Sequence, residues 1–389
     1  MPIERERRVK NSSAGKTPRD AARSPQALCK LPQPEGPLRC ARICGNLSAM
    51  PNTPSRRQFL VGSVGAATLV STSVNAAKNY AASPPAGFTP FSAPGKVVQV
   101  KKAGSLQENQ LYPKADDAKE MLTKALAELT GEADLVKAVA KFVHKDDKVV
   151  VKVNGIALKN MSTNKELVIP FVEAMIASGV PAENITMLEQ YFGFFGGTRI
   201  TQNNLPKGVK IAIHQNKDAT MDERSVAGVK TKFVRALTEA TAAINFALIK
   251  DHSICGYTGA LKNMTHGCTI NPHDFHAHNA SPQIAKLYNE DVIRSRVRLC
   301  IADGYKVMAH GGPLDKMPQY RSPHESVYVS TDPVAIDAVG WSVVEKARAD
   351  KGLKTLTAEK REPTYIQTAA ELGLGIADMS KIALKQITV

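Results

Sequence analysis

Apolar residues recur along this chain in short continuous runs and at helical spacing, and their order predicts a parallel α/β fold. The clearest unit is an apolar run at 148–153, an amphipathic segment at 165–178 and a second run at 184–188. Strand, helix and strand in that order are typical of parallel strands joined by a crossover helix. We therefore expect an α/β protein with two mostly parallel-sheet lobes, helices on the faces and a cleft between the lobes.

The same patterns predict the remaining elements and the domain boundary. Strands are expected at 97–100, 209–214, 229–234, 243–249, 297–302, 325–329 and 382–387, and helices at 115–129, 135–143, 281–289, 333–351 and 364–372. Asp332 before Pro333 is typical of a helix N-cap. The glycine-rich segment 191–199 does not match GxGxxG, so a flexible loop lining a cleft is favoured over a phosphate loop. A second strand series begins after residue 238, which separates an N-terminal lobe, 96–238, from a C-terminal lobe, 239–389.

The first 95 residues have the features of a leader and a linker. Residues 1–49 are rich in Arg, Pro and Ser, and we expect either disorder or an extension upstream of a true start at Met50. SRRQFL at 55–60 resembles the twin-arginine export motif, and VNA at 74–76 resembles a cleavage site. We expect a signal peptide at 50–76 and a linker at 77–95. The export machinery would be a partner, and the mature protein, with no stable membrane span, would be periplasmic or secreted.

Net charge and cysteine content narrow the function classes. The formal charge of +15 divides into +8 for residues 1–76 and +7 for the remainder, and no long basic block follows residue 76. A nucleic-acid partner is therefore not expected. Three cysteines follow the leader, and no CxxC occurs, so neither a disulfide framework nor an iron–sulfur cluster is expected. Cys300, in an apolar strand pattern, is interpreted as a small buried hydrophobe.

Candidate chemistry gathers in one stretch, residues 250–278. Five of the nine histidines lie in it, and the apolar run 243–249 leads directly into it. In open α/β sheets, ligands bind beyond the carboxyl ends of the strands, so a small-molecule ligand is expected here. Asn154 and Asp303 follow two other predicted strands. They are expected to point into the same crevice and to orient a ligand.

The lysine and histidines of this stretch allow two kinds of site. Lys262 and His266 are four residues apart and would share a helix face, where a shielded lysine can act as a base or nucleophile; the alternative is a surface lysine. His273, His276 and His278 could bind a transition metal such as nickel, zinc or iron. The alternative for these histidines is a solvated polar loop, because their spacing matches no standard zinc motif.

Three short motifs resemble the bacterial domain-of-unknown-function family 362. They are KVN at 152–154, GALKN at 259–263 and DPVAID at 332–337, and the resemblance covers roughly residues 96–350. Many members of that family carry ferredoxin-like cysteine clusters, which this chain lacks.

A more distant resemblance is to the nickel-pincer lactate racemases. His252, the segment GYTGALK at 256–262, and His278 occur in the same order and at similar spacing. The resemblance implies that Lys262 carries a covalently attached cofactor, that His278 binds nickel and that His252 is an acid/base. The chain departs from that family at Arg199, where a second histidine is expected, and at Leu261, which replaces a glycine.

These observations give one working hypothesis and one alternative. We expect an exported enzyme that acts on a small polar, hydroxy-acid-like substrate by proton or hydride transfer, with a metal or a bound cofactor. The alternative is a non-catalytic periplasmic protein that binds a metal or another ligand. The expected catalytic residues are His252 and Lys262; the expected cofactor-binding residues are Lys262, Asn263, Asn154 and Asp303; the expected metal ligands are His278, His266 and His276.

Overall fold

A nine-stranded sheet forms the centre of the computed structural model, which describes residues 78–389. Its strands are β1 (Lys96–Lys101), β2 (Val149–Lys152), β3 (Ile185–Glu189), β4 (Lys210–Ile213), β7 (Ala242–His252), β8 (Gly256–Thr258), β9 (Val297–Met308), β10 (Arg321–Ser330) and β11 (Ala383–Thr388). A separate hairpin pairs β5 (Arg224–Val226) with β6 (Val229–Thr231).

The strand order is β11-β1-β10-β9-β7-β2-β3-β4, with β8 paired to β7. The neighbours β9, β7, β2, β3 and β4 are all parallel, whereas β10 runs antiparallel to both β9 and β1. The predicted α/β class with a mostly parallel sheet is therefore confirmed. Strands from both sides of residue 238 join this one sheet, so the division into two lobes with a cleft between them is not confirmed.

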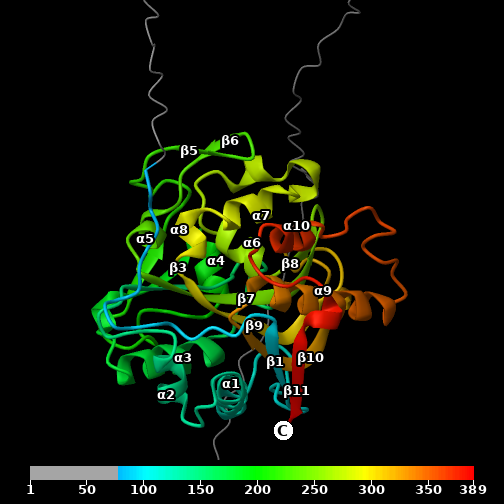
Figure 1. Ribbon diagram of the computed structural model, residues 1–389. Helices are drawn as coiled ribbons and strands as arrows, with labels where there is room; N and C mark the ends of the chain where they lie inside the picture. Colours follow the sequence, from blue (N-terminus) through cyan, green and yellow to red (C-terminus); the bar gives the residue numbers. More distant parts are fainter. Residues whose placement is uncertain (1–77) are drawn as a thin grey trace, which may run out of the picture. The chain divides into compact units, whose positions relative to one another are not determined.

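Helices cover both faces of the sheet (Figure 1). The helices are α1 (Ala115–Thr130), α2 (Leu135–Ala140), α3 (Lys165–Ala177), α4 (Phe192–Gly197), α5 (Arg235–Thr238), α6 (Ala260–Thr265), α7 (Gln283–Tyr288), α8 (Asp291–Arg294), α9 (Pro333–Ala349) and α10 (Tyr365–Glu371). Helices α1, α2 and α3 pack together on one face, and α6, α7, α9 and α10 pack together on the other.

Alternating side chains of each central strand enter two separate apolar cores. In β2, Val149 and Val151 pack with the core beneath α1–α3, whereas Val150 packs with the core beneath α6–α10. Successive side chains of a strand point to opposite faces, and a strand covered on both faces must be apolar on both. This is why the central strands read as continuous apolar runs in the sequence.

Two predicted elements differ from the structure. The glycine-rich segment is the short helix α4 rather than a flexible loop, and it lies so close to β2 that a Cβ on Gly155 would be 1.7 Å from the carbonyl oxygen of Phe194. Strand β9 continues through Asp303 to Met308 because β10 pairs with it along that length. The interruption of apolar character at Asp303 and Gly304 was wrongly taken as a strand end.

The leader and signal-peptide predictions lie outside the described residues. Residues 78–95 contain no helix or strand, as the predicted linker requires, yet they are attached to the fold. The Tyr80 amide donates to Asp291 Oδ2 at 2.8 Å, and the Gly95 amide donates to Asp332 Oδ2 at 2.9 Å. Within residues 78–389, no helix is long and apolar enough to cross a membrane.

Candidate active site

A cavity of about 300 Å³ lies beyond the carboxyl ends of β2, β3 and β7. Its volume is at the lower end of the range of roughly 300–1,000 Å³ that is usual for small-molecule pockets. The cavity is lined by polar side chains that follow these strands and by the histidine-rich stretch; they include Lys152, Asn154, Glu189, Lys250, His252, Lys262, Asn263, His266 and His276. The strand-end position is the one predicted from the apolar pattern.

Two of the three sequence motifs line this cavity, and the third holds the helix that carries Lys262. Asn154 Nδ2 donates to Asn263 Oδ1 at 3.1 Å, and Lys152 Nζ donates to the same oxygen at 3.3 Å, so β2 is joined to helix α6. Asp337, in the first turns of α9, accepts the backbone amides of Ala260 and Leu261 at 2.5 and 3.0 Å. Its carboxylate therefore caps α6, which carries Lys262.

Gly259 makes this capping contact possible. A Cβ at that position would lie 2.1 Å from Asp337 Oδ1 and 2.5 Å from the Tyr257 hydroxyl. The space beside Gly259 is therefore taken by the Asp337 carboxylate and the Tyr257 ring.

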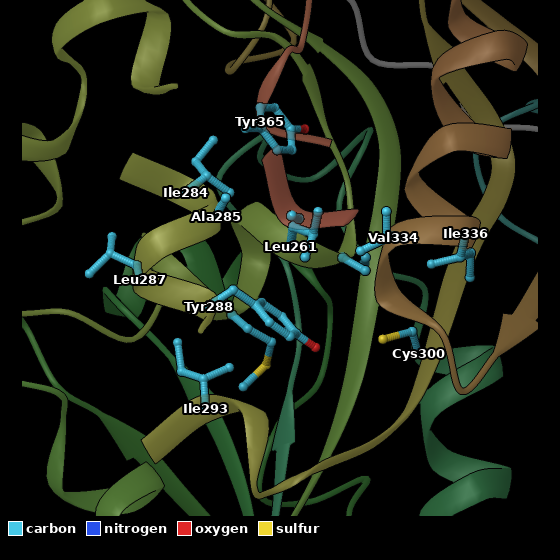
Figure 2. Packing of buried hydrophobic residues seen from close by; sticks show 14 of the residues in the cluster. Leu261, Ile284, Ala285, Leu287, Tyr288, Ile293, Cys300, Val334, Ile336 and Tyr365 are labelled. Carbon is cyan, nitrogen blue, oxygen red and sulfur yellow. The ribbon is translucent and has the colours of Figure 1, made fainter. Parts of the chain in front are cut away.

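Leu261 anchors the opposite side of α6 in the apolar core. Figure 2 shows its side chain between residues of α7 and α9, with Ile284 and Val334 among its neighbours and Tyr365 of α10 above it. Leu261 is fully buried. Because successive residues of a helix point in different directions, this packing of Leu261 turns Lys262 toward the cavity.

Lys262 Nζ has three hydrogen-bond partners. It lies 2.8 Å from His252 Nε2, 3.2 Å from His276 Nε2 and 3.3 Å from Cys255 Sγ. Lys262 is 5% exposed and lies at the cavity wall. These three contacts form the candidate active site.

The partners of the two imidazole rings determine their tautomers. His252 Nδ1 accepts the backbone amides of Ile254 and Cys255, at 3.2 and 3.4 Å, so the proton of the neutral ring is on Nε2. His276 Nδ1 faces two carbonyl oxygens, at 3.0 and 3.3 Å. A carbonyl only accepts, so the proton of His276 is on Nδ1 and its Nε2 has a free lone pair.

These tautomers require Lys262 to be a neutral amine. His252 Nε2–H donates to it, and an ammonium has no lone pair to accept that proton. A neutral amine has one lone pair and two N–H bonds, which here match the donor His252 and the acceptors His276 and Cys255. Cys255 in turn donates its S–H to the Tyr257 carbonyl at 3.2 Å. Every hydrogen-bonding position of the amine is therefore used.

The pKa directions agree with this assignment. Burial lowers the pKa of Lys262. Burial lowers the pKa of His252 well below its usual range and that of His276 to about 4. In apolar surroundings the charged form of a base is disfavoured, so all three directions favour the neutral forms.

Three buried polar atoms at the cavity have no hydrogen-bond partner within the described chain. They are Lys250 Nζ, Asn154 Oδ1 and Thr258 Oγ1. Lys250 is fully buried, and burial lowers its pKa from 10.5 to about 7. Buried polar atoms are rarely left unpaired, so these three positions are where a polar ligand would be hydrogen-bonded.

The other lysine of the cavity is already paired. Lys152 Nζ lies 3.2 Å from Glu189 Oε1, and both side chains are buried. Glu189 also accepts the backbone amides of Gly155 and Gln190, at 2.9 and 2.7 Å. This ion pair fixes the ends of β2 and β3 and leaves Lys250 as the lining lysine without a carboxylate or other hydrogen-bond partner among the described residues.

The structure brings most of the expected site residues together, but not all. His252, Lys262, Asn263, Asn154, His266 and His276 line the cavity, whereas Asp303 and His278 do not. Asp303 is not at a strand end, because β9 continues past it. Its side chain accepts the amide of Asn164 at 2.7 Å and so holds the start of α3. His278 is exposed, in a left-handed turn with φ of 51°.

The expected metal site is only partly assembled. The rings of His266 and His276 have centroids 4.7 Å apart, but His266 Nε2 is directed to the Phe275 carbonyl at 3.3 Å. Among residues 78–389, no group of three or more His, Cys, Asp or Glu side chains is placed to bind a metal ion.

Sequence reasoning gave no site role to Lys152, Glu189, Lys250, Cys255 or Asp337. Two of them could have been found, because Lys152 and Glu189 both end predicted neighbouring strands, and opposite charges at adjacent parallel strand ends can pair. Lys250 could also have been identified as a site residue, because it is a lysine at the end of an otherwise apolar run. Nothing in the sequence connects Asp337 to residues 260 and 261.

Two comparisons with known proteins bear on this chain. No curated protein matches it in sequence. The model of the family described as "Domain of unknown function (DUF362)" matches residues 130–342, which is 213 of the 389 residues. The match covers β2, β3, β7, α6 and the first turns of α9, so all three sequence motifs lie inside it. The chain belongs to the DUF362 family.

Proposed function

We propose that the mature chain is an enzyme that acts on a small, anionic, hydroxy-acid-like substrate by proton transfer. The observation that carries the proposal is the contact of 2.8 Å between Lys262 Nζ and His252 Nε2 at the wall of a small cavity, where the tautomers make Lys262 a neutral amine. A neutral lysine beside a proton donor is suited to base or nucleophile chemistry. A purely structural lysine gains nothing from such an environment.

An anionic substrate is supported by the charges around the cavity. Glu189 offsets Lys152, and Lys262 is neutral, so the remaining cation is Lys250, which has no counter-ion there. A carboxylate on the substrate would provide it. His252 would then hold or release the proton at the reacting atom, as the resemblance to lactate racemases also suggests.

The metal of those racemases does not fit the residues present. The histidine at the nickel-ligand position, His278, is exposed and outside the cavity. A covalent cofactor would be attached at Lys262. Intact mass of protein from its native host tests this directly, because an attached group adds mass to the peptide that contains Lys262.

The catalytic proposal is tested by hydrogen exchange at carbon. The protein is incubated in D₂O with three- to six-carbon hydroxy and oxo acids, and loss of the proton next to the carboxylate or carbonyl is followed by NMR. We expect exchange with at least one acid, and a decrease of about 10²–10⁴-fold in His252→Asn, the usual effect of losing a general acid/base. Lys346→Met, at a side chain that is 78% exposed, is the control.

A non-catalytic binding protein is the second candidate, supported by the adjacent rings of His266 and His276. A protein that only binds a metal should keep its zinc or nickel affinity in Lys262→Met and lose it in His276→Ala. Acid binding without carbon exchange in any of the acids would favour this candidate over the enzyme.

We also propose export through the twin-arginine pathway to the periplasm, on the basis of SRRQFL at 55–60. Replacement of Arg56 and Arg57 by lysine should leave the precursor in the cytoplasmic fraction. Unchanged appearance in the periplasm would contradict a twin-arginine route.

A further inference from the structure

Lys250 and Thr258 form the polar corner of the cavity. They are directly opposite each other across the antiparallel β7–β8 pair, so their side chains lie side by side on one face. Lys250 Nζ and Thr258 Oγ1 are both buried and unpartnered. A cation next to a hydroxyl donor provides two hydrogen bonds, which is what the two oxygens of a carboxylate require.

Lys262 lies four residues after Thr258, at the wall of the same cavity. Its amine is neutral, and burial lowers its pKa. A lysine in apolar surroundings is activated for attack on a carbonyl carbon. Asn154 Oδ1, a third unpartnered atom, is an acceptor in that cavity.

We propose that the cavity takes a small 2-oxo carboxylic acid, whose carboxylate is bound by Lys250 and Thr258 and whose carbonyl carbon forms an imine with Lys262 Nζ. The inference rests on the proposed function and names its substrate class. In such an acid the carbonyl carbon is bonded directly to the carboxylate. Both groups therefore fit in one small cavity, with the carboxylate at Lys250 and Thr258 and the carbonyl carbon at Lys262.

The step balances without an oxidant, a reductant or a further reactant. The amine lone pair forms a bond to the carbonyl carbon, and a proton moves from that nitrogen to His276 Nε2, which has a free lone pair, and from there to the oxygen. The nitrogen lone pair of the resulting carbinolamine then expels the hydroxyl. The hydroxyl takes the remaining N–H proton through the same ring and leaves as water, so one imine and one water are formed.

Borohydride trapping tests the inference on the full chain. The protein is mixed with ¹³C-labelled pyruvate, reduced with borohydride and digested for mass spectrometry. We expect an added mass equal to pyruvate minus one oxygen atom on the peptide that contains Lys262, and none in Lys262→Met. Circular dichroism of that variant establishes that it is folded. An adduct only on exposed lysines would overturn the inference.

Lys250→Met tests the carboxylate subsite separately. The pyruvate concentration needed for half-maximal trapping should rise about 10- to 100-fold, the value of a charge-assisted hydrogen bond. Trapping of hydroxyacetone, which has no carboxylate, should stay within a few-fold of wild type. Equal loss for both compounds would overturn the assignment of Lys250 to the carboxylate.

Binding and trapping together separate this inference from the proposed function. Pyruvate bound by saturation-transfer NMR but never trapped overturns the imine and leaves an enzyme for small anions in place. Neither binding nor carbon exchange with any acid overturns both. Trapping that survives in His276→Asn at the wild-type rate contradicts the part of His276 in the proton transfers.

Discussion

Replacing Lys250 by methionine should make the protein more stable. Lys250 is fully buried, its Nζ has no hydrogen-bond partner, and burial lowers its pKa from 10.5 to about 7. Methionine has a similar length and no charge, so it fills the same space without the cost of an unpaired ionisable group.

The size and pH dependence of the effect follow from the pKa. The pKa of Lys250 falls from 10.5 in the unfolded chain to about 7 in the folded protein, a difference of about 3.5. A pKa difference of one corresponds to ~1.36 kcal/mol, so burying Lys250 costs at most roughly 5 kcal/mol. Because the folded-state pKa lies below the unfolded one, the unfolded chain binds the proton more tightly. The cost is therefore fully present below pH 7, and it disappears as the pH rises toward 10.5.

Urea unfolding of wild type and Lys250→Met at several pH values measures this. We expect a gain of about 2–5 kcal/mol in the free energy of unfolding at pH 6, decreasing steadily to pH 9.5. Lys346→Met, at an exposed site, should change it by less than about 0.5 kcal/mol. A variant less stable than wild type at pH 6, or a gain that does not change with pH, would refute the reasoning.

Three further predictions concern the same region. Asp337→Ala should lower the free energy of unfolding by about 2–4 kcal/mol and speed amide exchange at residues 260 and 261, measured by urea unfolding and hydrogen-exchange mass spectrometry; unchanged exchange there would contradict the capping role. Gly155→Ala, with its Cβ 1.7 Å from a backbone oxygen, should cost about 1–3 kcal/mol in urea unfolding, whereas Gly193→Ala, with open space, should not. Pyruvate affinity, by titration calorimetry, should be constant below pH 7 and fall about tenfold per pH unit above it, because Lys250 must be protonated; constant affinity to pH 9 would contradict this.

The parallel part of the fold was predictable because its strands are buried on both faces. The apolar runs at 148–153, 184–188 and 243–249 correspond to β2, β3 and β7, and their ends correctly located the cavity. The continuation of β9 past Asp303 was not predictable, because those residues owe their strand conformation to pairing with β10. The residues of β9 do not by themselves indicate that pairing.

The site was predictable as a set of residues but not as an arrangement. His252 and Lys262 were correctly expected to lie at one cavity, and their contact at 2.8 Å follows from the hairpin of β7 and β8. The neutral state of Lys262 depends on backbone amides and carbonyls that orient two imidazole rings, which no residue pattern encodes. Asp337 acts across 77 positions in the chain, and only the packing of α9 against α6 reveals it.

His252 and Lys262 lie ten residues apart in one hairpin and the helix that follows it. Closing so short a loop costs little entropy, so the reactive pair is a product of local chain folding. Asn154 and His276, in contrast, reach the cavity from β2 and from the turns after α6. These outer walls can therefore change without disturbing the proton-sharing pair, which is contained in a single short segment.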